Sequence, residues 1–117
     1  MPVLVLMVGI LLVMGCGEDP VDTALADCAE DTNWTTVGAP FVYTWCTPCH
    51  SPDLKGADAR QGATEGVNFA SYDDVVSRAD RFEIRVFAES GPMPPTGGPS
   101  EADLAAVAAW LECGMPE

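Results

Sequence analysis

The feature that most constrains this chain is the pentapeptide Cys46-Thr47-Pro48-Cys49-His50, near the middle of the 117 residues. Two cysteines separated by two residues and followed directly by a histidine form the pattern of covalent c-type haem attachment. In that chemistry each thiol closes a thioether to one haem vinyl group, and the adjacent imidazole ligates the iron. The same residues would also suit a C-x-x-C thiol-disulfide pair or half of a zinc site. The rest of the chain has to distinguish among these three.

Residues 1–15 are expected to be a signal peptide of the lipoprotein type. Met1 to Met14 are almost wholly apolar and uncharged, a length that suits a secretory segment better than a membrane span. The run ends in Val13-Met14-Gly15-Cys16, which resembles the lipobox of bacterial lipoproteins. We therefore expect Cys16 to carry a lipid anchor, with the protein in the bacterial cell envelope, on the periplasmic or outer face. The alternative is an ordinary cleavage nearby that leaves Cys16 as a spare thiol.

The remaining cysteines are expected to form a disulfide. Export places the mature chain in a compartment that tolerates disulfides. Once Cys16 and the two central cysteines are assigned, Cys28 and Cys113 are left, one near each end of the mature chain. The alternatives are two free thiols, or metal ligation together with the central cysteines.

The charge of the chain excludes one class of partner. Eighteen acidic residues against five basic ones give a formal net charge of -13. Binding to a phosphate backbone needs clustered Lys and Arg, so nucleic acid is not expected as a partner. The acidity suits redox partner proteins with basic docking faces, or it serves only to keep the surface soluble.

Composition and apolar spacing divide the mature chain into an acidic tether, 16–33, and a small helical domain, 34–117. Trp34 to Val37 is expected to be extended. A short helix should then begin near Pro40, because proline is tolerated in a first turn, and should carry its apolar side to the cysteines. After His50, the segment 51–68 has several Gly and Pro residues and no sustained period, which predicts a loop that wraps one face of a cofactor.

Three further helices are predicted from capping patterns and apolar spacing. Ser71 with Asp74 and Ser100 with Asp103 each resemble a capping box ahead of an apolar period. Asp80 with Glu83 suggests another start, with a helix over Phe82 to Ala88 that ends before Gly91-Pro92. The last helix should end at Gly114. The expected core contributions of these helices are Tyr72, Val75, Val76, Ala79, Phe82, Val86, Phe87, Leu104, Val107, Ala108 and Leu111.

His50 is the only histidine in the chain, so a second axial ligand to a haem iron must be another residue type. Thioether sulfur is the usual soft partner. Three of the five methionines fall in the expected signal peptide, and Met115 is expected to lie in a frayed C-terminus. Met93 remains, in a turn stiffened by Pro92, Pro94 and Pro95. The alternative for Met93 is a gap-filling methionine in a Pro-rich turn.

The order of helix, Cys46-Thr47-Pro48-Cys49-His50, loop, short helices, Gly91-Pro92-Met93-Pro94-Pro95 and a final helix with Trp110 resembles the mono-haem class I cytochrome c family over 40–114. The resemblance implies a small all-α domain of three to four short helices and long loops around one haem c. It implies axial ligation of the iron by His50 and Met93, and a contact of Trp110 with Phe41 or Gly38. The Gly-Pro pair that often follows the haem histidine is absent, which leaves open which carbonyl holds the imidazole N–H.

The implied function is one-electron transfer between envelope redox partners, without catalysis. Two alternatives remain: a haem-based sensor or peroxidase-like protein with an open sixth site, and a C-x-x-C thiol-disulfide oxidoreductase that uses Cys46 and Cys49. Haem propionates in an acidic protein need cationic or donor partners, although surface pairing with carboxylates explains any single arginine as well. The candidates are Arg60, Arg78, Arg81 and Arg85.

Overall fold

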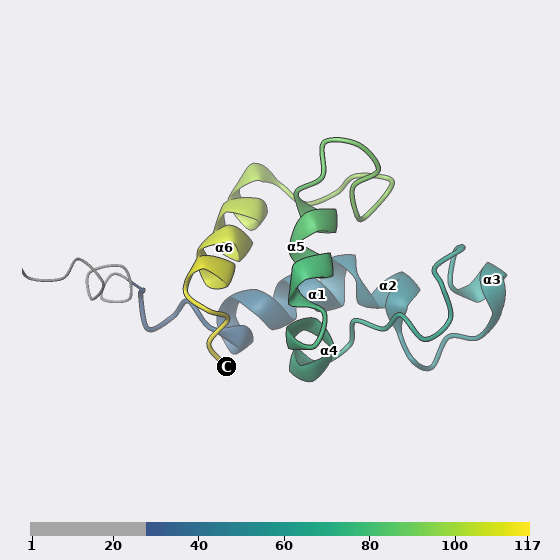
Figure 1. Ribbon diagram of the computed structural model, residues 1–117, viewed down its shortest axis with the longest axis horizontal. Helices are drawn as coiled ribbons and strands as arrows, with labels where there is room; N and C mark the ends of the chain where they lie inside the picture. Colours follow the sequence, from purple (N-terminus) through teal and green to yellow (C-terminus); the bar gives the residue numbers. More distant parts are fainter. Residues whose placement is uncertain (1–27) are drawn as a thin grey trace, which may run out of the picture.

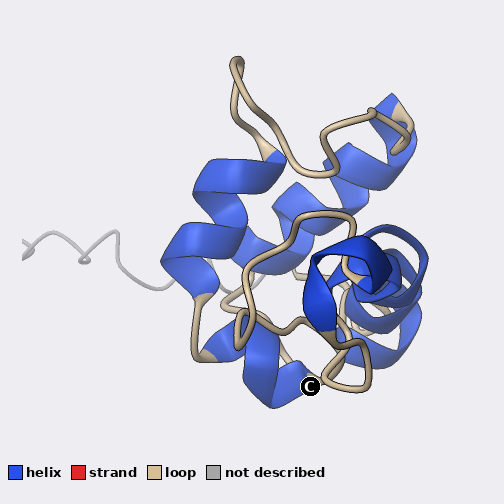
Figure 2. Ribbon diagram, turned by 90° about the vertical axis from the view of Figure 1, so that its right-hand side faces the viewer, coloured by secondary structure: helices blue, strands red, loops and turns tan. Residues whose placement is uncertain are grey.

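The computed structural model describes residues 28–117, so Cys16, the expected signal peptide and the first part of the expected tether lie outside the described residues. A π-helix, η1, leads directly into the first α-helix, and five more α-helices follow (Figure 1). No strand is present in residues 28–117 (Figure 2), which confirms the all-α expectation for this part of the chain. The expected number of three to four helices was too low, because these residues form six α-helices and a π-helix. In chain order the elements are η1 (Trp34–Gly38), α1 (Ala39–Trp45), α2 (Thr47–His50), α3 (Gly56–Ala59), α4 (Tyr72–Val76), α5 (Ala79–Val86) and α6 (Glu101–Glu112).

Two of the predicted helix starts are confirmed by their caps. The Ser71 hydroxyl accepts the Asp74 N–H at the start of α4, at 3.2 Å. The Ser100 hydroxyl accepts the Asp103 N–H at 3.1 Å, and the Asp103 carboxylate accepts the Ser100 N–H at 3.0 Å. Such reciprocal bonds satisfy donors that the first turn of a helix otherwise leaves without partners. The end of α6 also falls as expected, with Gly114 just beyond it at a φ of 79°.

The expectation of an extended segment at Trp34 to Val37 was wrong, because these residues are helical. The Asn33 side chain accepts the Thr36 N–H at 3.1 Å and so caps η1. The N–H of Ala39 donates to the Trp34 carbonyl, five residues back, which is the π-helical spacing. Pro40 lies in the first turn of α1, where the N–H that it lacks would have no partner within the helix.

The start of α5 was also predicted wrongly. The helix begins at Ala79, and the residue before it, Arg78, makes no side-chain cap. Asp80 therefore lies inside the first turn, where its charge suits the helix N-terminus, and does not cap a helix that begins at Phe82. Two residues expected in the core are exposed instead, Val76 by 40 % and Phe87 by 41 %. Phe87 and Ile84 line a groove between α5 and α6 together with Glu83 and Glu112.

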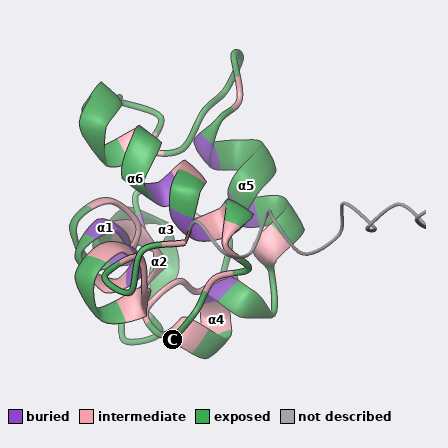
Figure 3. Cartoon of the chain, turned by 90° about the vertical axis from the view of Figure 1, so that its left-hand side faces the viewer, coloured by how far each residue is buried: buried purple, intermediate pink, exposed green. Residues whose placement is uncertain are grey.

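The core lies where α1, α4, α5 and α6 meet (Figure 3). Gly38 is buried at the crossing of η1 with α6, where a Cβ would lie 3.0 Å from two ring carbons of Trp110. The close approach of these helices therefore requires a glycine at this point, and of the two neighbours expected for Trp110 this contact confirms Gly38. The buried apolar side chains are Phe41, Val42, Val75, Phe82, Val86, Val107 and Trp110.

The C-terminal tail is bound to the core, so the expectation of a frayed end at Met115 was wrong. The Met115 carbonyl accepts the Tyr72 hydroxyl at 2.9 Å, and Met115 itself packs against the core. The Pro116 carbonyl accepts both the Trp110 indole N–H, at 2.9 Å, and the Trp34 N–H, at 2.8 Å. In Figure 1 this end of the chain lies well away from α2.

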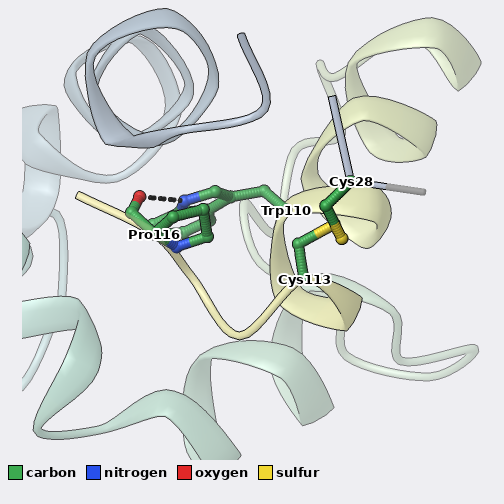
Figure 4. The surroundings of a disulfide bond; sticks show 4 residues. All are labelled: Cys28, Trp110, Cys113 and Pro116. Carbon is green, nitrogen blue, oxygen red and sulfur yellow. Dashed lines mark hydrogen bonds between the residues drawn. A yellow bond between two sulfur atoms is a disulfide. The ribbon is translucent and has the colours of Figure 1, made fainter. Parts of the chain in front are cut away.

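The predicted pairing of Cys28 with Cys113 is confirmed (Figure 4). The two Cα atoms lie 5.8 Å apart, and the bridge joins residues separated by 85 positions. It fastens the start of the described chain to the residue that follows α6. The Pro116 tail and the disulfide therefore hold the two ends of the domain together independently.

Candidate functional site

The Cys46-Thr47-Pro48-Cys49-His50 pentapeptide lies at the junction of α1 and α2. The Cys46 carbonyl accepts the N–H of Cys49 at 3.1 Å and that of His50 at 2.9 Å, which folds the pentapeptide into a single helical turn. Both thiols are free and half-buried. The turn therefore presents two unpaired thiols and an imidazole within one short stretch of chain.

A main-chain carbonyl fixes the orientation of the His50 ring. The Nδ1 atom of His50 lies 2.7 Å from the Val67 carbonyl oxygen. Because a carbonyl oxygen only accepts hydrogen bonds, Nδ1 carries the proton and Nε2 carries the free lone pair. The Phe69 ring packs edge-on against the imidazole, with centroids 5.4 Å apart and an interplanar angle of 78°. The imidazole is thus held in the tautomer that ligates a metal through Nε2.

The segment around Val67 is itself bonded to the turn. The Phe69 N–H donates to the His50 carbonyl at 2.9 Å. The Thr47 hydroxyl lies 2.9 Å from the Phe69 carbonyl and 3.2 Å from the Val42 carbonyl, so it ties the turn to both neighbours. These bonds answer the question that the missing Gly-Pro pair left open: the carbonyl that holds the imidazole N–H is that of Val67, 17 residues after His50.

The segment 51–68 was expected to be a loop throughout, and α3 is a single helical turn within it. Arg60 directly follows α3 and is buried, with 1 % of its surface exposed. Its guanidinium donates to five main-chain carbonyls and one side-chain amide, which uses all of its N–H donors within the loop. One acceptor is the Val67 carbonyl, at 2.8 Å from Nη2, so Arg60 and His50 share that oxygen. The sequence suggested two roles for Arg60, as a propionate partner or as a surface partner of carboxylates, and the buried guanidinium, bonded to main-chain carbonyls, fits neither. The one sequence signal for its structural role is an arginine within a segment rich in glycine. The acceptors are Ser51, Leu54, Ala63, Thr64, Val67 and the Asn68 amide.

The other three candidate arginines are exposed, on or next to α5. Arg78 donates to the Gly66 carbonyl at 3.1 Å, and Arg85 donates to the Gly91 carbonyl at 3.3 Å. Arg81 is exposed within α5. These side chains keep donors free for an anionic group, whereas Arg60 does not.

Met93 lies on the loop between α5 and α6, separate in the chain from the haem-attachment pattern. Its N–H donates to the Arg85 carbonyl at 2.9 Å, and its side chain is 37 % exposed. Further along the same loop, Gly98 packs on the Trp45 ring so closely that a Cβ would lie 2.3 Å from Cζ3. Since Trp45 directly precedes Cys46, this contact brings the Met93 loop to the end of α1 that carries the first thiol.

Burial raises the pKa of the Cys46 thiol to about 12. A thiol pKa above the ordinary value leaves the group protonated across the physiological range. Redox-active C-x-x-C pairs work in the opposite way, with a thiolate stabilised by a lowered pKa. The environment of Cys46 is therefore apolar and does not favour a free nucleophilic thiolate.

The donor set fits a covalently attached haem. Cys46 and Cys49 have the required spacing and are free, and His50 has its Nε2 lone pair available. A closed zinc site would need further ligands. Within residues 28–117, no three His, Cys, Asp or Glu side chains come together in a way that would hold a metal ion.

None of the described helices is long and apolar enough to cross a membrane.

Comparisons with known proteins add no identification. No protein-family model matches the chain, and neither a curated protein nor a solved structure matches it significantly. The site must therefore be interpreted from its own residues.

Proposed function

We propose that this protein is an electron carrier, a small c-type cytochrome of the class I kind with one covalent haem. Cys46 and Cys49 would form the thioethers, and His50 and Met93 would be the axial ligands of the iron. The haem, when bound, supplies a one-electron ferric-ferrous couple. The protein's part is to hold the ligands in place, to exclude water and to present an acidic surface to its redox partners.

The observation that carries the proposal is the state of the three attachment residues. Two free thiols stand three positions apart on one turn, and the next residue is a histidine whose Nδ1–H is bound to the Val67 carbonyl. A histidine that ligates a metal commonly donates its other ring N–H to such an oxygen, because the bond fixes the ring and its tautomer. His50 has this arrangement, which supports its assignment as the iron ligand.

Met93 is supported as the second ligand by the course of its loop. The loop is held at one end by the Met93 to Arg85 bond and at the other by the contact of Gly98 with Trp45. The first contact fixes the Met93 end of the loop to α5, and the second places the other end against Trp45, the residue before Cys46. A filled sixth position would favour electron transfer over substrate binding, so we assign no catalysis to the protein.

Expression in a bacterial host with a c-type haem-attachment system tests the proposal. The expected result is haem staining that survives denaturing electrophoresis, together with an optical spectrum of six-coordinate, low-spin iron. The oxidised protein should also show the weak sulfur-to-iron band at the red edge of the visible spectrum. Absence of covalent haem in such a host would overturn the proposal.

The same spectrum distinguishes the first alternative, a haem-based sensor or peroxidase-like protein. If Met93 does not bind the iron, the sulfur-to-iron band is missing and the ferrous protein binds carbon monoxide readily. The 37 % exposure of Met93 is the observation that keeps this alternative open to test.

The second alternative, a thiol-disulfide oxidoreductase, has less support. Thioredoxin-like enzymes place their C-x-x-C pair at a strand-to-helix junction, and residues 28–117 contain no strand. The raised pKa of Cys46 also works against a reactive thiolate. Dithiol reductase activity without bound haem would establish this alternative.

Envelope localisation is part of the proposal. The Cys28–Cys113 disulfide is consistent with an oxidising compartment. We propose that Cys16 carries the lipid, so metabolic labelling with a radioactive fatty acid should mark the protein and should fail for Cys16→Ser. The acidic surface would then meet redox partners with basic docking faces, with an association rate that falls as salt is added.

A pair of glycine variants tests the placement of the Met93 loop. In Gly98→Ala the new Cβ collides with the Trp45 ring, so the loop must move and the sulfur-to-iron band should be lost while covalent haem is retained. Gly97→Ala is the matched control, because Gly97 also has a positive φ but a Cβ there meets nothing within 4 Å. The sulfur-to-iron band should persist in Gly97→Ala. Equal spectra for the two variants would contradict the assignment of this loop as the source of the sixth ligand.

A further inference from the structure

Arg60 is an unusual residue to bury completely. A buried guanidinium is costly unless its donors are satisfied, and here they are satisfied by neutral groups alone. The acceptors are main-chain carbonyls and the Asn68 amide, none of them a carboxylate. The positive charge is therefore dispersed over dipoles and is not cancelled by an anion among these acceptors.

The Val67 carbonyl connects this charge to the haem ligand. Its oxygen lies 2.8 Å from Nη2 of Arg60 and 2.7 Å from Nδ1 of His50, so both donors compete for its electron density. A carbonyl that already accepts from a cation is a weaker acceptor for a second donor. The imidazole N–H is then less strongly polarised than it would be toward a free carbonyl, and His50 is a weaker electron donor through Nε2.

We propose that Arg60 is a positioning residue for His50: it fixes where the Val67 carbonyl lies and limits how strongly that oxygen accepts the imidazole N–H. The consequence, which rests on the proposed function, is a higher reduction potential for a haem ligated by His50. Electron donation by the imidazole stabilises ferric iron more than ferrous iron, so a weaker donor reduces this preference and raises the potential. The nearby unpaired cation acts in the same direction, because the ferric state carries one more positive charge.

Arg60→Lys is the direct test. Lysine keeps the charge but has a single ammonium in place of the planar fork, so it cannot reach acceptors on all sides of the loop. The Val67 carbonyl then bonds His50 alone, and the reduction potential should fall. The expected change is about tenfold in the equilibrium constant for reduction, about 59 mV for one electron. The potential is measured by spectroelectrochemical titration of the purified holoprotein.

Arg78→Lys is the matched control. Arg78 donates to the neighbouring Gly66 carbonyl in the same loop but is exposed and makes no bond to Val67. The substitution conserves charge in the same way, and its change in the equilibrium constant should stay below about threefold, since exposed interactions contribute little. Equal shifts for the two variants would mean that Arg60 acts only by general support of the loop, and would overturn the inference.

A measurement on the unaltered holoprotein covers the case in which Arg60→Lys fails to fold. In the ferrous protein, NMR should show slowly exchanging guanidinium protons of Arg60 with a cross-relaxation peak to the His50 Nδ1 proton. Rapid exchange of these protons with water would overturn the inference. A wild-type protein without covalent haem would overturn the proposed function and this inference together, whereas an unchanged potential in a haem-bearing Arg60→Lys variant overturns only the role of Arg60.

Discussion

Replacement of Cys46 and Cys49 together by serine is expected to abolish the haem that survives denaturing electrophoresis and to cost the domain its ordered tertiary structure. The first effect follows from the proposed thioethers, which serine cannot form. The second follows from the small core. The buried apolar side chains are few, and a domain of this size buries too little surface to be stable by a wide margin. A covalently bound haem would add a large apolar surface that the loops can pack against.

The measurement is near-UV circular dichroism of the double variant beside haem staining. The matched control is Cys28→Ser with Cys113→Ser, which removes the same number of cysteines but none of the attachment thiols. The control should keep its haem stain, and at moderate temperature its near-UV signal, while the Cys46 and Cys49 variant should lose both. A well-ordered, haem-free double variant would show that the domain does not depend on the cofactor.

Local signals in the sequence were sufficient for part of this fold. Ser71 and Ser100 each begin a helix because a serine hydroxyl and an acidic residue three positions on satisfy the first-turn donors, an interaction contained within four residues. The end of α6 at Gly114 is likewise local. The pairing of Cys28 with Cys113 could be predicted by elimination, since the other cysteines had assignments.

Where the prediction failed, both an unrecognised local cap and contacts distant in sequence were responsible. The helix over Trp34 to Val37 is capped locally by Asn33, and its first N–H is bound to the distant Pro116 carbonyl. Met115 is ordered because its carbonyl accepts the Tyr72 hydroxyl, 43 residues earlier in the chain. Phe87 directly follows the last residue of α5, Val86, and is exposed. The predicted helix therefore included one apolar residue that lies outside it.

The candidate site divides in the same way. The pentapeptide itself is contiguous, so Cys46, Cys49 and His50 could be named from the sequence. The group that orients His50 could not be named, because it is the main-chain carbonyl of Val67. Every residue has such a carbonyl, so the identity of the side chain gives no sign of the bond. Arg60 was noticed for its charge, but its role depends on the path of the loop around it.

Loss of the Cys28–Cys113 disulfide is expected to lower the free energy of unfolding by about 4 kcal/mol. The bridge closes a loop of 85 residues, so its removal mainly frees the unfolded chain. The folded ends should stay together, because the Pro116 carbonyl still accepts from Trp34 and Trp110. For a domain of this size the loss corresponds to a Tm lower by roughly 15–30 °C.

Guanidinium unfolding of the Cys28→Ser, Cys113→Ser holoprotein, followed by far-UV circular dichroism, measures this loss. The slope of free energy against denaturant should rise, because an unfolded chain without the bridge exposes more surface. Reduction of the wild-type disulfide should reproduce both changes, whereas the same reductant should leave the double variant as it was. An unfolding free energy that does not change on reduction would contradict the stability assigned to the bridge, because the contacts at Pro116 exist only in the folded state and cannot replace the bridge as a restraint on the unfolded chain. The proposed thioethers at Cys46 and Cys49 would not be cleaved by the reductant, so the comparison isolates the contribution of the disulfide.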